Sequence, residues 1–428
     1  MDTDGGGGGI MQHSMVDNVL PSAIYRPIVI FCIGLWGWGL NLYLLNKQHI
    51  DPAQLLLIHG VEKNSPLHQP IFGLATIATG LIICNVWWYN WISPWHWTPI
   101  LCYVFAFLLV LWPGKNLYRK ERERFIRVLR RILSPNLFSK VYFGDVILAD
   151  ILTSFSNVFG DLFSTCCSAT TNENPCYRDV LVPLLISLPY MIRLRQCLSE
   201  YIDSGGECKR HLWNALKYAS AFPVIIISAS QKKADRYIAA TGSVPSTWWV
   251  SDTGLFRLWM LFVFLNSMYS FWWDISMDWS LINVSASSRT TMMTSHAHQH
   301  HIRHYTTPIV RFRRHFHFNE AGLYYAAMII DFLLRTTWSL KIGSHLYARR
   351  LAGSIFMMQL LEVVRRWVWV IFRMESEWVK RTMASLPTDN STMLAMDPIN
   401  NTGNTSGATS KLMPIREEED DDNEDNTT

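Results

Sequence analysis

The stretch "LEVVRRWVWVIFR", residues 361 to 373, sets Glu362 and the adjacent Arg365 and Arg366 in a run that is otherwise almost entirely apolar. A charged side chain near the middle of a bilayer costs at least about 2.5 to 3.5 kcal/mol on insertion scales. Such residues must find partners inside a helix bundle. Glu362 lies three and four residues before the arginines and can pair with either one.

The composition indicates a membrane protein. Of the 428 residues, 49% are hydrophobic, only 17% are charged and 19 are Trp. Several apolar runs approach the roughly 20 residues that span about 30 Å of hydrocarbon. The predicted fold class is therefore all-α, a polytopic membrane helix bundle of about nine transmembrane helices. The predicted spans are residues 25–46, 71–92, 98–113, 141–165, 179–199, 212–230, 253–273, 321–341 and 350–372.

The two ends differ from this body. Residues 1–24 hold a glycine run and are predicted to be flexible, whereas 25–380 form the transmembrane domain. The first apolar run is too long and aromatic for a signal peptide, so we expect a retained span. Residues 381–428 are predicted to be a disordered tail, in which "EEEDDDNED" places eight acids at 417–425. The chain carries +4 overall, so the remainder carries +12.

Basic residues predict the orientation. They concentrate in the segment 114–140, which the positive-inside rule places in the cytosol. Alternation then puts the N-terminus in the lumen, and the His/Arg-rich loop 280–318 and the C-terminus in the cytosol. The basic segment has helical spacing and is expected to lie on anionic lipid headgroups, with a protein partner as the alternative.

Histidines and cysteines suggest no metal site. The loop "HAHQHHIRHYTTPIVRFRRHFHF" lacks the HxxHH spacing of membrane di-iron enzymes, and a basic pH-sensitive loop is the simpler interpretation, with metal binding as the alternative. Cys166, Cys167 and Cys176 share one short segment that is expected to be lumenal, where a disulfide or free thiols are equally compatible with the sequence.

Polar groups recur inside the predicted spans. Asp150, Thr153, Ser154 and Asn157 recur at i, i+3, i+4 and i+7, so one helical face should look into the bundle. Asp274 and Asp278 lie about one turn apart and repel each other unless a cation or a proton lies between them.

The charge count favours an anion site. Five cations, Arg193, Lys217, Arg335, Arg365 and Arg366, face four anions, Asp150, Asp278, Asp331 and Glu362. Guanidinium groups bind tetrahedral oxyanions in a bidentate manner. The alternative is a purely structural cluster of charges that holds the helices together.

Six motifs in order carry a family resemblance: "ADILTSFS", "IRLRQCL", "NALKYASAF", "WDISMDW", "IIDFLLRTTW" and "LEVVRRWVWVIFRMESE". From about residue 25 to 380 the chain resembles the EXS domain of eukaryotic phosphate exporters related to the xenotropic and polytropic retrovirus receptor. With only 24 preceding residues, too few for a phosphate-sensing SPX domain, it is most similar to the SPX-less Golgi branch of ER-retention-defective proteins.

The resemblance implies a phosphate site. Its members would be Asp150, Ser156, Arg193, Lys217, Tyr218, Asp278, Arg335, Trp338, Glu362, Arg365 and Arg366. Thr153 stands where the exporters have Asn; a hydroxyl can still donate to phosphate, and we keep Thr153 in the candidate site. Trp338 would act as a gate.

The sequence therefore predicts a transporter or channel of the Golgi membrane that moves inorganic phosphate, released by lumenal glycosylation, to the cytosol. Such transport would support glycosylation and the retention of resident proteins. The alternative is a non-transporting scaffold or sorting receptor for glycosyltransferases, which would bind a cytosolic coat adaptor. No catalytic residues, cofactor or nucleic-acid partner are expected; membrane lipids are expected partners, and a homodimer stays an open alternative.

Overall fold

The computed structural model describes residues 24–57, 66–92, 97–112, 114, 116–170, 175–242, 251–291, 303–313, 315–339 and 352–385. The described residues up to Met383 form one compact unit. Nearly all of the predicted N-terminal segment and the acidic tail lie outside the described residues, as do the histidines at 296, 298, 300 and 301 and the side chain of Cys176.

Each predicted span overlaps a helix or a helix pair in the described part of the chain, which confirms the all-α membrane bundle. The single helices are α2 (Arg26–Lys47), α4 (His68–Trp91), α5 (Thr98–Leu111), α9 (Pro175–Asp203), α12 (Asp252–Trp273), α13 (Ala321–Arg335) and α15 (Ala352–Ser385). The pairs are α7 (Phe143–Ser154) with α8 (Ser156–Thr170), and α10 (Lys209–Ala219) with α11 (Ala221–Thr241). Smaller elements are α3 (Pro52–Leu55), α6 (Arg119–Leu133), the π-helix η1 (Asp274–Asp278) and the 3-10 turn η2 (Thr337–Ser339).

Length and composition separate the helices into two groups. In the described part of the chain, five helices are long and apolar enough to cross a membrane, and the bent pair α7–α8 makes a sixth. Helix α5 is apolar but shorter. Helices α13 and α15 do not pass this test, because α13 has only 15 residues and α15 carries the charges of the opening motif.

The bend of 58° between α7 and α8 falls at Phe155. One turn earlier, the Thr153 hydroxyl donates to the Asp150 carbonyl at 2.7 Å, a back-bond that bends helices. Asp150, Thr153 and Ser154 are buried as predicted, whereas Asn157 is exposed. The predicted polar face was therefore wrong at Asn157, because the helical period is broken before that residue.

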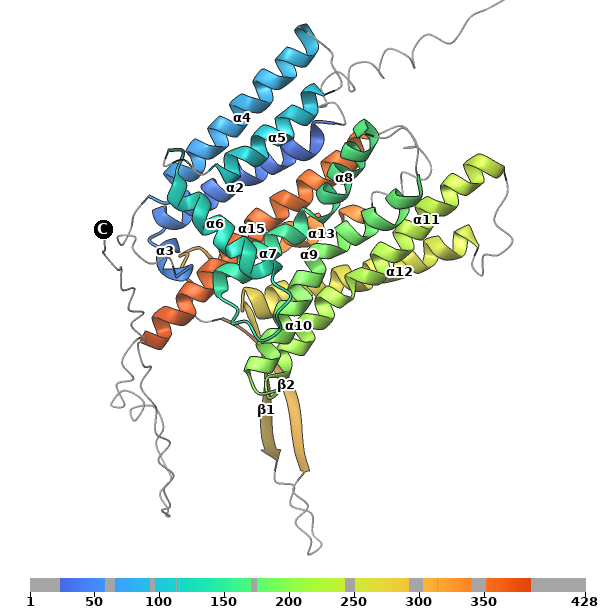
Figure 1. Ribbon diagram of the computed structural model, residues 1–428. Coiled ribbons are helices and arrows are strands. Elements are labelled where there is room, and N and C mark those ends of the chain that lie inside the picture. The colour runs from blue at the N-terminus through green and yellow to red at the C-terminus, as the bar shows by residue number, and fades with distance from the viewer. Residues whose placement is uncertain are drawn as a thin grey trace, which may run out of the picture. The chain divides into compact units, whose positions relative to one another are not determined.

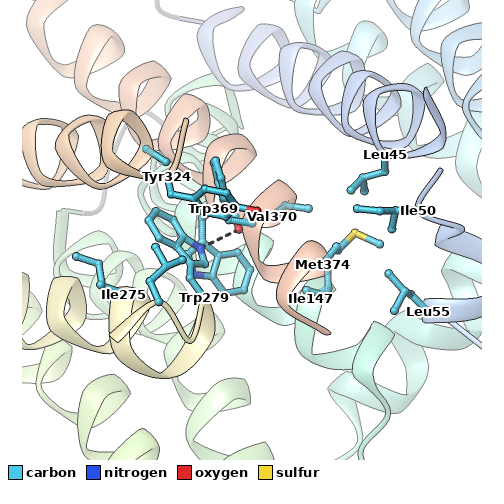
Figure 2. Packing of buried hydrophobic residues seen from close by; sticks show 13 residues of the cluster. Leu45, Ile50, Leu55, Ile147, Ile275, Trp279, Tyr324, Trp369, Val370 and Met374 are labelled. Atoms are coloured by element: carbon cyan, nitrogen blue, oxygen red, sulfur yellow. Dashed lines mark hydrogen bonds between the residues drawn. The ribbon is translucent and has the colours of Figure 1, made fainter. Parts of the chain in front are cut away.

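Helix α15 lies among helices from distant parts of the chain (Figure 1). It meets α2, where the Asn41 amide donates to the Trp367 carbonyl at 3.2 Å. It also meets the segment after α12, where the Trp279 indole donates to the Trp369 carbonyl at 3.3 Å (Figure 2). The core cluster around these tryptophans includes Leu45, Ile147 and Met374, so α2, α7 and α15 share one apolar core.

The distribution of polarity is reversed relative to a protein in water. Trp91 is 78% exposed, Phe107 64% and Ile226 63%, whereas Asp274 is 0% and Arg365 3% exposed. Lipid tails accommodate apolar side chains on the outside, and the bundle interior holds the ionisable groups.

The predicted topology places several segments on the same side of the membrane, and these segments contact one another. His317 Nε2 donates to the Gln48 carbonyl at 2.7 Å, and Arg381 Nη1 to the Gln54 carbonyl at 3.3 Å. The Arg313 guanidinium binds both carboxylate oxygens of Glu375, at 2.6 and 2.7 Å. The ends of α2 and α12 and the extension of α15 therefore lie at one end of the bundle, as the predicted topology requires.

The predicted loop 280–318 contains a β-hairpin. Strands β1 (Ile282–Thr291) and β2 (Arg303–Phe312) pair antiparallel, with Ile282 opposite Phe312 (Figure 1). Both strands contain Val, Ile and Thr, and β2 also contains Tyr, residues that favour extended backbone. The interpretation as a loop followed the histidines and missed this pattern.

Close approach of α2 to α15 depends on Gly37. A Cβ built there would overlap the Trp367 ring. We expect Gly37→Val to lower the free energy of unfolding by about 1–3 kcal/mol, because overpacking displaces a rigid indole. Thermal unfolding in detergent, followed by tryptophan fluorescence, measures the loss. Gly80→Ala, whose Cβ meets nothing within 4 Å, is the control; equal melting temperatures for both variants would contradict the packing described here.

Candidate functional site

Two side chains from different helices converge on Asp150 of α7, which is 2% exposed. The Tyr218 hydroxyl donates to Asp150 Oδ1 at 2.6 Å and Arg193 Nε donates to the same oxygen at 3.0 Å. Arg193 Nη1 also donates to Gln196 at 2.5 Å, and its guanidinium lies 4.8 Å from the centre of the Tyr218 ring. This end of the site joins α7, α9 and α10.

Asp274, the first residue of the π-helix η1, is the hub of the network. It is fully buried and contacts Lys217 Nζ at 3.5 Å, Arg365 Nη1 at 3.6 Å and the Arg335 guanidinium. Asp278, at the end of the same π turn, also accepts from Lys217, at 3.4 Å. Helices α10, α13 and α15 are thereby connected through one carboxylate.

Two further carboxylates surround Arg365. Its Nη2 donates to Glu362 Oε1 at 2.5 Å and its Nη1 to Asp331 Oδ1 at 3.2 Å. Asp331 also accepts from Arg335 Nε at 3.0 Å. The Glu362 side chain is 35% exposed, whereas that of Asp331 is 1% exposed, so the network opens at Glu362.

Arg366 differs from the other buried cations. Its Nε donates to the Ser154 hydroxyl at 2.9 Å and its Nη2 to the Thr153 hydroxyl at 3.0 Å. Among the residues that the structure describes, it forms no ion pair with a carboxylate. Its guanidinium lies 4.7 Å from the centre of the Trp369 ring, beside a recess that Asn41 and Phe155 help to line. Arg366 thus holds a positive charge whose direct contacts, among the described residues, are hydroxyls and a ring.

Most of the predicted site residues meet in this one network. Those joined by the contacts above are Asp150, Thr153, Arg193, Lys217, Tyr218, Asp278, Arg335, Glu362, Arg365 and Arg366. Ser156 is buried at the start of α8, beyond the bend.

Trp338 lies elsewhere, in the turn η2. Its ring packs edge to face on Trp259, with centroids 6.2 Å apart, within an apolar cluster of α11 and α12. The buried Trp338 indole N–H has no hydrogen-bond partner among the described residues. The structure therefore places this predicted gate beside the apolar cluster.

The sequence-based charge count omitted Asp274. With it, the five cations of the network face five carboxylates, and the excess of positive charge in the count disappears. The signal was available, because Asp274 precedes Asp278 by about one turn. Periodicity could not show that a π turn directs both carboxylates at Lys217. Only the geometry around Arg366, and not the number of charges, distinguishes an anion site from a structural cluster of charges.

The sequence of this chain is similar to those of several known proteins. The EXS family model matches residues 22–379. "Protein ERD1 homolog 1" of Schizosaccharomyces pombe is 30% identical over 375 residues, covering 83% of this chain and 90% of that protein. "Xenotropic and polytropic retrovirus receptor 1 homolog" of Xenopus laevis is 26% identical over 88% of this chain and 54% of its own length. "Solute carrier family 53 member 1" of Mus musculus is 26% identical, over 83% of this chain and 50% of that protein.

The fold and the site define a multi-pass membrane protein built around a buried ionic network. The chain belongs to the EXS family. It spans most of its fission yeast relative and only about half of the frog and mouse relatives.

The hub predicts a large stability effect. We expect Asp274→Asn to lower the free energy of unfolding by about 3–5 kcal/mol, because it leaves buried cations without their shared carboxylate. Chemical unfolding in detergent measures this difference. Glu123→Gln, which breaks an exposed pair with Arg119 on α6, should leave the unfolding midpoint unchanged. Equal midpoints for Asp274→Asn and the parent protein would show that Asp274 is not the hub.

Proposed function

We propose that this protein transports inorganic phosphate through the bundle, from the lumen of the Golgi to the cytosol. The observation that carries the proposal is Arg366, a buried guanidinium held by the hydroxyls of Ser154 and Thr153 and by no described carboxylate. A tetrahedral oxyanion could accept from the Arg366 guanidinium in place of these two hydroxyl oxygens. The solute-carrier name of the mouse relative and the resemblance to phosphate exporters support the same class of activity.

The neighbouring carboxylates would make binding reversible. Arg365 and Arg335 are held by Asp274, Asp331 and Glu362, so they are not left as bare charges when no anion is bound. Conduction requires that an ion can leave as well as bind. Competition between these carboxylates and phosphate for the same guanidinium groups would weaken binding enough for release.

The bend at Phe155 supports a transport role. Discontinuous helices place backbone ends and hydroxyls at the substrate sites of many transporters. Here the bend sets Ser154 against Arg366 and Glu362, at 2.9 Å from each. We place the N-terminus in the lumen and the C-terminus in the cytosol, since the basic helix α6 follows the third apolar helix.

A role in recovering phosphate from lumenal glycosylation, and so in retaining Golgi residents, follows from the resemblance to the ER-retention-defective branch. Disruption of the gene should therefore raise lumenal phosphate and mislocalise glycosyltransferases. Normal localisation of these enzymes in the disrupted strain would count against this role and leave the transport proposal intact.

Phosphate flux tests the proposal directly. In proteoliposomes we expect Arg366→Gln to reduce the initial rate of radiolabelled phosphate uptake by about 10- to 100-fold at low phosphate, since hydrogen bonds to a charged group contribute about 1.5–3 kcal/mol. Arg119→Gln, on the exposed face of α6, is the control of equal charge change. Equal uptake by the parent protein and Arg366→Gln, or no uptake above empty liposomes, would refute transport through this site.

A further inference from the structure

Arg373 lies two helical turns after Arg366 on α15, just beyond the predicted span, and the proposed transport path does not yet include it. Its side chain is 14% exposed and its guanidinium lies 5.2 Å from the centre of the Phe143 ring. The buried Nε has no hydrogen-bond partner among the described residues. A buried guanidinium N–H without an acceptor is rare in folded proteins, and a bound ion is one way to satisfy it.

The other contacts of Arg373 are long. Its Nε lies 3.8 Å from Asp278 Oδ1 and its Nη1 lies 3.7 Å from Glu377 Oε2. Its one hydrogen bond to the described part of the chain, from Nη1 to the Asp278 carbonyl, is 3.5 Å long. Ion pairs with good geometry have N to O distances of about 2.7–2.9 Å. In the same end of the bundle, Arg313 reaches Glu375 at 2.6 and 2.7 Å, so tight pairing is attainable there.

Both carboxylates near Arg373 are shared with other cations. Asp278 Oδ2 accepts from Lys217 at 3.4 Å, and Glu377 Oε1 accepts from Arg381 at 3.0 Å. Each of these carboxylates therefore lies closer to another cation than to Arg373. Its charge is not fully compensated by either neighbour.

Two more cations stand close by. Lys380 follows Arg373 by seven residues, on the same face of α15, and Arg210 at the start of α10 donates to the Met277 carbonyl at 3.0 Å. Lys380 itself is exposed, and partial desolvation, followed by the charges of Arg373 and Arg210, lowers its pKa to about 8, against the weaker opposite effect of Glu377 and Asp278. Three basic groups thus face two shared carboxylates.

We propose that Arg373, Lys380 and Arg210 form a second oxyanion site, which receives phosphate from the central network and releases it at the C-terminal end of the bundle. This inference rests on the proposed transport of phosphate. Asp278 lies between the two sites, with one oxygen toward Lys217 and the other toward Arg373. Phosphate at Arg373 would repel this carboxylate toward Lys217, which would discourage return of the anion to the central site.

The test is phosphate flux through Arg373→Gln in proteoliposomes, with the same protein assayed for phosphate binding at the central site by the rise in melting temperature that phosphate causes. We expect flux at low phosphate to fall at least tenfold. The phosphate-induced rise in melting temperature should persist in Arg373→Gln, whose central site is intact, and should be smaller in Arg366→Gln, which keeps only the second site. Arg236→Gln, an exposed basic residue of α11 paired with Asp179, is the control and should transport normally.

The variant Lys380→Gln provides a second measurement, which remains informative even if the Arg373→Gln variant does not fold. As the pH at the C-terminal side rises through about 8, Lys380 loses its charge, so flux through the parent protein should fall more steeply than flux through Lys380→Gln. If the parent protein carries phosphate and both variants match it in rate and pH profile, the second site is refuted while transport stands. If the parent protein carries no phosphate, transport itself fails.

Discussion

The cost of placing charge inside a membrane protein governs this structure. Asp274, fully buried, is tolerable only because Lys217, Arg335 and Arg365 surround it. Without Asp274 each of these cations would lose one of its carboxylate partners, and only such partners offset the desolvation of a buried ion. These ion pairs, together with packing, thus fix the positions of helices α10, α13 and α15 relative to one another.

The apolar core performs a different task from the ionic network. Trp279 and Trp369 pack at the centre of a cluster to which α2, α7 and α15 contribute (Figure 2). This cluster lies beside the charges and fixes the backbone from which Arg365 and Arg366 project. In a lipid environment, dispersion and close packing must supply much of the association between helices, because lipid tails are as apolar as leucine. Gly37 permits such close packing, because a Cβ at this position would overlap the Trp367 ring.

Departures from regular helix coincide with the ionic residues. The bend at Phe155 brings Ser154 to Arg366, and the π turn presents Asp274 and Asp278 to the same lysine. π turns and broken helices occur often at functional sites, where they redirect side chains that a regular helix would place elsewhere. The bend gives Arg366 a hydroxyl partner, and no carboxylate among the described residues pairs with it. The π turn gives Arg365 one of its several carboxylate partners.

The helical class, the positions of the spans and most residues of the network follow from the sequence alone, because ionisable groups in apolar runs are so costly to bury that they must meet inside the bundle. The sequence could not identify Asp274 as the hub, the exposure of Asn157 or the β-hairpin at Ile282–Phe312. These depend on a bend, a π turn and strand pairing, which break the regular period on which sequence interpretation relies. Which cation goes without a carboxylate was decided only by tertiary structure, because pairing depends on side chains that meet from helices up to 213 residues apart.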